Sequence, residues 1–383
     1  MLIFLWISGL LVALANGAND NAKGIATLVG SRMASLKTAL TWANFMTLAG
    51  ATAAIPMALY INAGLLKAFG GGGLLPASFA VDGRYLLAVG LGAAITILLA
   101  TRLGIPVSTT HGLLGALIGA GLVAVGPGQL VWAILGKKFV LPLLLSPLLA
   151  AAATAILAPL FRFGLKAVRV EKQLCLCVEQ CYVPVINQGG ALMLAATGKT
   201  LTLDEVQNCE TRFAGKVFTF SAQRFFEAGQ FFTGGLVSFA RGLNDTPKIA
   251  GILVAGAAAA GVAGGMFAGG NAKALAMGAV AALMLLGGLL FTRRVADTMA
   301  KKITAMDGEQ GFVGSLVTAI LVILASWKQL PVSTTHVSVG SLFGIAAVSG
   351  TARWKTILLI LTAWITTLPL AAALAAAVYA TIR

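Results

Sequence analysis

The sequence contains few charged residues and almost no histidine. Of its 383 residues, 10% are charged, 58% are hydrophobic and only two are histidine. A water-soluble domain needs more polar surface than this composition supplies, so we expect a surface that faces lipid. Several uncharged stretches reach the roughly 20 residues that cross a bilayer, including Leu103 to Gly136, Phe139 to Phe161 and Thr356 to Ile382. The chain is therefore predicted to be a multi-pass membrane protein.

The sequence also lacks the patterns that are typical of nucleic-acid binding and of metal sites. Although the net charge is +15, the sequence has no basic stripe interleaved with aromatics, and basic residues at loop ends are typical of membrane orientation, so no nucleic-acid partner is expected. The few cysteines match no zinc or iron–sulfur spacing, and we interpret them as free thiols with no metal or cofactor. They are Cys175, Cys177, Cys181 and Cys209.

The chain repeats itself. Gly17-Ala-Asn-Asp20 is echoed by Gly242-Leu-Asn-Asp245, and Pro106-Val-Ser-Thr-Thr-His111 recurs identically at 331–336. Both pairs share an offset of 225 residues. Because two unrelated motifs keep one spacing, a whole segment has been duplicated.

This duplication divides the chain into a first transmembrane repeat at 1–161, a polar central region at 162–227 and a second repeat at 228–383. We predict an all-α membrane protein with two inverted repeats of about five spans each, 10 to 12 segments in total, with broken helices or re-entrant hairpins. Met1 to Ala15 lacks a basic region before its apolar run, so it is interpreted as an uncleaved first helix. The predicted spans lie near 1–30, 38–61, 85–101, 105–126, 131–161, 228–262, 274–292, 310–327, 329–350 and 356–382.

Loop charges give an orientation. With the amino terminus outside, about twice as many lysines and arginines fall inside as outside. The positive-inside rule thus favours outside termini and a cytoplasmic central region. The expected location is the cell (inner) membrane.

All acidic residues except Asp20 and Asp245 lie in polar segments. A carboxylate inside a bilayer costs a few kcal/mol or more unless it has a partner or a task. One alternative is that each aspartate only pairs with Lys23 or Lys248. The recurrence of this aspartate–lysine pair in both halves favours a functional role for the aspartates. Glycine and asparagine beside each aspartate also lead us to expect an unwound backbone that exposes carbonyl groups.

The Pro-Val-Ser-Thr-Thr-His segments add hydroxyl donors at a predicted helix start, where free amides attract anions. Two copies offer six hydroxyls, which suits a tetrahedral oxyanion with acceptors in several directions. Alternatively, the serines and threonines only cap a helix. His111 and His336 end these segments, and their equivalent positions make them candidates for proton handling.

With these paired motifs, the chain resembles the inorganic phosphate transporter (PiT) family over nearly its whole length. The resemblance implies cation-coupled phosphate uptake, both motif pairs in the middle of the membrane, and a homodimer. By position, the substrate site would contain Asn19, Asp20, Ser108, Thr109, Thr110, Asn244, Asp245, Ser333, Thr334 and Thr335.

Lys23 departs from the family, whose first motif commonly has asparagine there. Lysines at 23 and 248 can take the place of sodium ions and leave the empty site nearly neutral, so proton coupling is favoured over sodium. The lysines can also bind the anion directly. Phosphate keeps a hydroxyl that a carboxylate accepts and sulfate has none, so sulfate is the second candidate. A membrane-embedded hydrolase is less favoured because an enzyme needs only one such set of residues.

Overall fold

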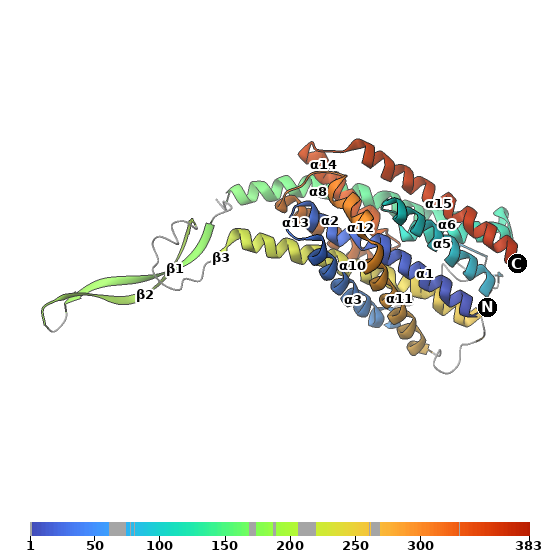
Figure 1. Ribbon diagram of the computed structural model, residues 1–383, viewed down its shortest axis with the longest axis horizontal. Coiled ribbons are helices and arrows are strands. Elements are labelled where there is room, and N and C mark those ends of the chain that lie inside the picture. Colours follow the sequence, from blue (N-terminus) through green and yellow to red (C-terminus); the bar gives the residue numbers. More distant parts are fainter. Residues whose placement is uncertain are drawn as a thin grey trace. The chain divides into compact units, whose positions relative to one another are not determined.

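Helices make up most of the protein in the computed structural model (Figure 1). The residues that it describes are 2–60, 74–76, 78, 79, 81–167, 174–186, 189–205, 220–259, 261, 269–328 and 330–383. Two compact units are present. The first, a helical bundle, combines Met1–Ala158 with Gln230–Arg383, and the second comprises Pro159–Gly229.

The first half contributes a series of helices that ends before the central region. They are α1 (Leu2–Asp20), α2 (Ala22–Gly30), α3 (Leu36–Tyr60), α5 (Gly83–Leu103), α6 (Thr109–Val125), η1 (Pro127–Gln129), α7 (Trp132–Ile134), η2 (Leu135–Val140) and α8 (Leu141–Ala167). The second half contributes α10 (Ala222–Ala259), α11 (Gly269–Phe291), α12 (Arg293–Lys301), α13 (Gly308–Trp327), α14 (Thr334–Ser349) and α15 (Trp354–Ile382).

The offset seen in the sequence also fixes where helices begin. α5 starts at Gly83 and α13 at Gly308, while α6 starts at Thr109 and α14 at Thr334, each pair 225 residues apart. Asp82 and Asp307 each cap the helix that follows by accepting a backbone N–H. The two halves therefore fold as copies of one pattern.

Six helical segments of the described residues are long and apolar enough to cross a membrane. The spans predicted at 105–126 and 329–350 are shorter than expected, because the backbone at 105–108 and 330–333 is not helical and the helices begin only at Thr109 and Thr334. These helices have 17 and 16 residues, fewer than the roughly 20 of a full span. The prediction of five full spans in each half is not confirmed.

Helices of the first half pack against helices of the second half. Gly17 of α1 lies against the carbonyl of Met284 in α11, and Gly242 of α10 lies against the carbonyl of Thr47 in α3. In the same way α6 packs on α15, and Gly340 of α14 contacts Pro147 of α8. Since a Cβ atom at either Gly17 or Gly242 would collide with that backbone, these glycines permit close helix contact. The core thus interleaves helices of both repeats.

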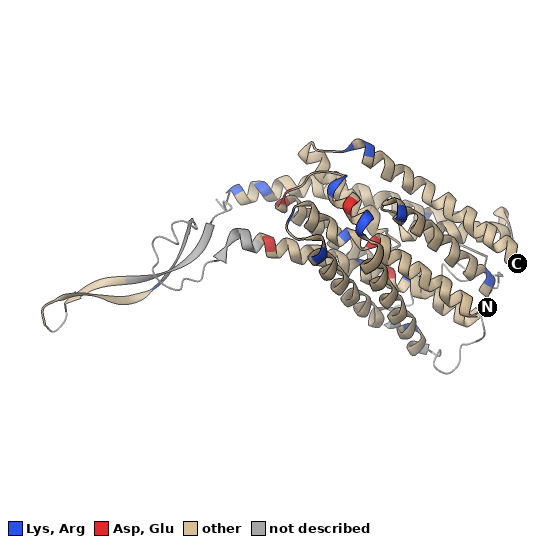
Figure 2. Ribbon diagram, viewed as in Figure 1, with Lys and Arg blue, Asp and Glu red and all other residues tan. Residues whose placement is uncertain are grey.

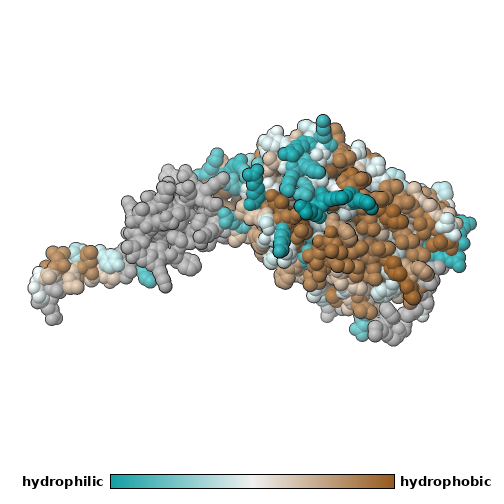
Figure 3. All heavy atoms as spheres, in the orientation of Figure 1, coloured by the Kyte–Doolittle hydropathy of each residue, from teal (hydrophilic) through white to brown (hydrophobic). Residues whose placement is uncertain are grey.

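Large apolar side chains cover much of the outside of the bundle. Leu148 of α8 is 66% exposed and Ile365 of α15 is 73% exposed. Figure 3 shows a broad apolar surface on the bundle, and Figure 2 shows most of its charged ribbon away from the end where both termini lie. Such a surface fits contact with lipid acyl chains.

The unit Pro159–Gly229 contains a three-stranded sheet, which the all-α prediction missed. β1 (Leu174–Ile186) pairs antiparallel with β2 (Leu192–Glu205), and with β3 (Phe220–Ser221), in the order β2-β1-β3. Apolar and β-branched residues recur along both long strands, and Gly190 turns between them at φ 75°. Three of the cysteines belong to the backbone of β1, whereas Cys209 lies outside the described residues.

Candidate functional site

The backbone at both Gly-x-Asn-Asp segments stays helical, so the predicted unwinding there is wrong. α1 ends at Asp20, and Asn21 leads into α2 with helical angles (φ −65°, ψ −22°). α10 continues without a break through Asp245. The glycines serve close packing between helices instead of unwinding. Consequently these segments supply the site with side chains, not with freed carbonyl groups.

Non-helical backbone lies instead at 105–108 and 330–333, and Ser108 and Ser333, which end these stretches, are extended. The Ser108 hydroxyl accepts a bond from the N–H of His111 (3.2 Å), and the Ser333 hydroxyl accepts one from the N–H of His336 (3.1 Å). Both serines therefore cap their helices, which was the alternative weighed from the sequence. A hydroxyl that accepts in this way can still donate its own proton to a ligand.

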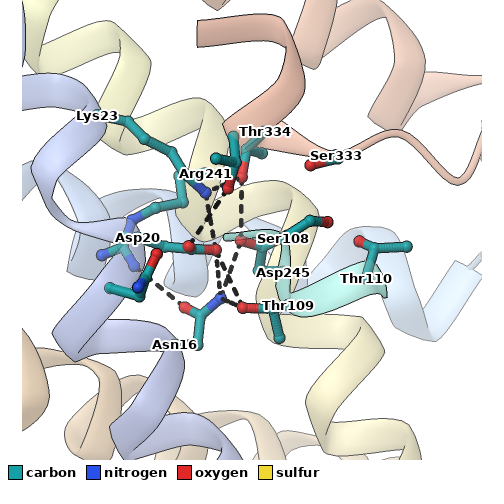
Figure 4. Close-up of polar contacts among 12 residues, drawn as sticks. Asn16, Asp20, Lys23, Ser108, Thr109, Thr110, Arg241, Asp245, Ser333 and Thr334 are labelled. Atoms are coloured by element: carbon teal, nitrogen blue, oxygen red, sulfur yellow. Dashed lines mark hydrogen bonds and ion pairs between the residues drawn. The ribbon is translucent and has the colours of Figure 1, made fainter. Parts of the chain in front are cut away.

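Asp20 and Asp245 lie close together in the buried core, although half the chain separates them in sequence (Figure 4). One amide bridges them, because Asn16 Nδ2 donates to Asp20 Oδ2 (2.9 Å) and to Asp245 Oδ2 (3.1 Å). Asp20 also pairs with Lys23 Nζ at 2.7 Å, and Asp245 pairs with Lys248 Nζ at 3.4 Å. The two predicted half-sites thus form one polar cluster.

Threonine hydroxyls tie each carboxylate to the start of a short helix. Thr109 Oγ1 donates to Asp20 (3.1 Å), and Thr334 Oγ1 donates to Asp245 (3.4 Å). Lys23 Nζ donates to Thr334 Oγ1 at 2.5 Å, so a lysine of the first half also meets a hydroxyl of the second. Hydroxyl and ammonium donors of the two halves therefore meet in one cluster around the two buried carboxylates.

The next threonine in each run makes a reciprocal contact. Thr110 Oγ1 donates to the carbonyl of Val332 (3.5 Å), and Thr335 Oγ1 donates to the carbonyl of Val107 (2.8 Å). Lys248 Nζ reaches Thr110 Oγ1 (3.3 Å) and the carbonyl of Val332 (2.9 Å). Reciprocal contacts of this kind are what a two-fold arrangement produces.

The two asparagines brace the site from the side. Asn19 Nδ2 donates to Thr101 Oγ1 of α5 (3.0 Å), and its Oδ1 accepts from the N–H of Val107 (3.0 Å). Asn244 Oδ1 accepts from Ser326 Oγ of α13 (3.2 Å). Thr101 and Ser326 occupy equivalent repeat positions. Each asparagine therefore holds its carboxylate segment against the helix that precedes the hydroxyl run.

The two histidines are brought into contact with each other. The rings of His111 and His336 have their centroids 4.5 Å apart at 86°. His336 Nδ1 lies 3.1 Å from the carbonyl oxygen of Leu143, and its ring lies 3.9 Å from that of Trp364. Among the described residues, His111 Nδ1 and His336 Nε2 are buried without a hydrogen-bond partner. Their part in proton handling stays a prediction.

Two residues of this cluster were missed in the sequence. Asn16 bridges the carboxylates, and Arg241 Nη1 donates to Asn16 Oδ1 at 3.1 Å. Since Arg241 adds a third buried cation, the expectation of a nearly neutral empty site is wrong. A signal was available, because an arginine inside an apolar span is itself a functional candidate. The 225-residue offset also places it at the repeat position of Asn16.

The sequence is similar to known proteins over most of its length. The sequence model of the phosphate transporter family matches residues 16–375 of this chain. A protein of Pyrococcus abyssi named "Putative phosphate permease" is 30% identical over 99% of this chain and 97% of its own length. A protein of Rhizobium meliloti named "Probable low-affinity inorganic phosphate transporter" is 27% identical over 95% of this chain and 91% of its own.

A solved structure has the same fold. The structure titled "The sodium-dependent phosphate transporter" superimposes with a TM-score of 0.74, covering 100% of this chain and 98% of that one at 24% sequence identity. At this identity the likeness concerns the fold. The interleaved helices that carry the site are therefore a known architecture.

Proposed function

Because the chain belongs to the phosphate transporter family, we propose that it imports inorganic phosphate across the cell (inner) membrane by symport with protons. The chain is a multi-pass membrane transporter and not an enzyme. The observation that carries the proposal is the meeting of two repeat-related carboxylates and their threonine and lysine donors in one buried cluster. A carrier needs such a site in the protein interior, where both halves can act on one ligand.

Phosphate binding would exchange partners within this cluster. In the present arrangement the Asp20 and Asp245 carboxylates accept the bonds of Lys23, Lys248, Thr109 and Thr334. A phosphate ion offers oxygens to the same donors, with Ser108, Ser333, Thr110 and Thr335 as further hydroxyls. The carboxylates that lose these donors then accept the hydroxyl of phosphate. Sulfate has no hydroxyl to give, which favours phosphate.

The same exchange explains coupling to protons. A buried carboxylate without its lysine partner is costly as an anion, and uptake of a proton removes that cost. The Lys23 and Lys248 ammonium groups already sit 2.7 Å and 3.4 Å from the carboxylates, where a sodium ion would otherwise be attracted. The pair of His111 and His336 lies at the starts of the same short helices and is a second candidate for the proton.

The reciprocal contacts support a transport cycle of two inverted repeats that rock against each other around the site. We also propose outside termini, a cytoplasmic central region and a homodimer. Addition of an impermeant thiol reagent to intact cells tests the orientation, because the cysteines of the central region should label only after permeabilisation.

Uptake of radiolabelled phosphate into proteoliposomes tests substrate and coupling together. A proton gradient with an alkaline interior should drive saturable accumulation without sodium, and a protonophore should abolish it. Excess sulfate should compete weakly. Strict dependence on sodium would overturn proton coupling, and strong competition by sulfate would overturn phosphate as the preferred substrate.

A lysine substitution with a matched control sharpens this test. Lys23→Asn removes a buried ammonium and should lower proton-driven uptake about tenfold or more, with partial recovery in sodium. Lys301 forms an ion pair of the same length, 2.7 Å with Asp297, but it is 61% exposed. Lys301→Asn should leave uptake unchanged. Equal rates for both variants would contradict the role of Lys23.

A further inference from the structure

Arg241 is buried in the middle of α10, next to the cluster that holds Asp20 and Asp245. Its side chain is 1% exposed, and among the described residues no carboxylate lies within ion-pair distance of it. Its N–H groups donate to three neutral oxygens, Asn16 Oδ1 (3.1 Å), Asn21 Oδ1 (3.3 Å) and Thr47 Oγ1 (2.8 Å). A buried guanidinium costs several kcal/mol unless charge of the opposite sign compensates it. The fold retains this charge beside the polar cluster.

Arg241 determines which way the amide of Asn16 points. A guanidinium has only donors, so the oxygen of the amide must face it and the nitrogen must face away. That nitrogen then lies within hydrogen-bond distance of Asp20 Oδ2 (2.9 Å), Asp245 Oδ2 (3.1 Å) and Thr109 Oγ1 (2.9 Å). The bridge between the two half-sites therefore depends on the hydrogen bond from Arg241 to Asn16 Oδ1.

Arg241 also sets the charge of the cluster. Lys23, Lys248 and Arg241 are basic, whereas Asp20 and Asp245 are acidic, and all five side chains are buried. The lysines and aspartates balance one another, so the surplus of one positive charge comes from Arg241. In a medium of low dielectric constant a surplus charge acts strongly on an incoming anion.

We propose that Arg241 is a positioning residue of the oxyanion site: it locks Asn16 as the bridge between the two carboxylates and supplies the surplus positive charge that draws the anion in. This inference rests on the proposed phosphate transport. It assigns different duties to repeat-equivalent positions, since residue 16 is the bridge and residue 241 is its anchor.

Transport kinetics of Arg241→Lys and Arg241→Gln in proteoliposomes separate this role from a purely structural one. Lysine keeps the charge and has only donors, so its KM should stay within about threefold of wild type. Glutamine is neutral and has an acceptor as well as donors, so it no longer fixes the Asn16 amide and should raise KM about tenfold or more with little change in kcat. Melting temperatures of the purified variants control for folding. A wild-type KM for Arg241→Gln, or equal impairment of both variants, would overturn the proposal.

A double-mutant cycle tests the link through Asn16. Asn16→Ala should raise KM in the wild-type background and have little further effect beside Arg241→Gln, because the bridge is already lost. Additive effects would overturn the positioning role. If Arg241→Gln does not fold, Thr47→Val decides: it removes one anchor of the guanidinium, and a severalfold increase in KM supports the proposal whereas an unchanged KM overturns it.

These results are distinguishable from failure of the proposed function. If wild-type protein neither accumulates phosphate nor gains thermal stability from it, the transport proposal fails. If wild-type protein does both and Arg241→Gln behaves identically, only the role of Arg241 fails.

Discussion

The half-site of Asp20 and the half-site of Asp245 share a frame and differ in detail. In both, an aspartate pairs with the lysine three residues later and accepts from the first threonine of a capped helix. In the first half-site α1 passes into α2 at Asn21 with helical angles and the ion pair is shorter, while the second half-site lies in one continuous helix. Residue 16 is asparagine and its counterpart 241 is arginine. Both half-sites therefore keep the groups at the centre of the polar cluster, while the residues at positions 16 and 241 that support them differ.

The largest expected effect comes from removing either carboxylate. Asp20→Asn and Asp245→Asn should each lower phosphate uptake at least about tenfold and destabilise the protein by about 3–5 kcal/mol, because each leaves a buried lysine without its counter-charge. Uptake assays and thermal unfolding of purified protein measure both quantities. If the half-sites are equivalent in function, the two variants agree within about threefold.

Two controls complete this comparison. Asp297→Asn breaks an exposed ion pair and should change neither uptake nor stability. Asp20→Asn combined with Lys23→Met removes a buried pair as a whole and should recover stability without recovering uptake. Normal transport in either single variant would show that the carboxylates do not handle the ligand.

An intermediate effect is expected at the glycines where the halves interleave. Gly17→Ala and Gly242→Ala should each cost about 1–3 kcal/mol, because the new methyl group meets a neighbouring backbone carbonyl. Gly278 of α11 is an exposed helical glycine with open space around it, and Gly278→Ala should be neutral or stabilising. Thermal unfolding measures all three. Loss of stability in only one of the first two would break the equivalence of the helix contacts.

The smallest expected effect is at the helix caps. Ser108→Ala and Ser333→Ala should each cost about 1 kcal/mol and raise KM for phosphate about threefold if the hydroxyl also donates to the ligand. Asp82→Ala removes the cap of α5, away from the cluster, and should lower stability without changing KM. An unchanged KM in both serine variants would restrict these residues to capping.

Sequence reasoning predicted the family, the duplication and the meeting of Asp20 with Asp245. It could not predict the continuous α10. Glycine disfavours a helix by itself, but at Gly242 it allows the close approach of α3, which stabilises the helix and cannot be seen in the sequence. Nor did sequence reasoning find the strands of the central unit, whose side chains show no strict alternation. Arg241 was overlooked because it and its repeat counterpart, Asn16, differ in residue type and lie outside the motifs that recur in both halves.

By itself the sequence determined the chemistry of the two half-sites, since an aspartate, a lysine and a hydroxyl run recur at one offset in an otherwise apolar chain. Only the tertiary structure decided how these groups share their bonds. Interleaved helices bring residues more than 200 positions apart within 3 Å of each other, as Lys23 and Thr334 show. Hydrogen bonds form only over such short distances. The partners of each buried group, and the surplus charge of the cluster, therefore depend on helix packing that no local sequence pattern indicates.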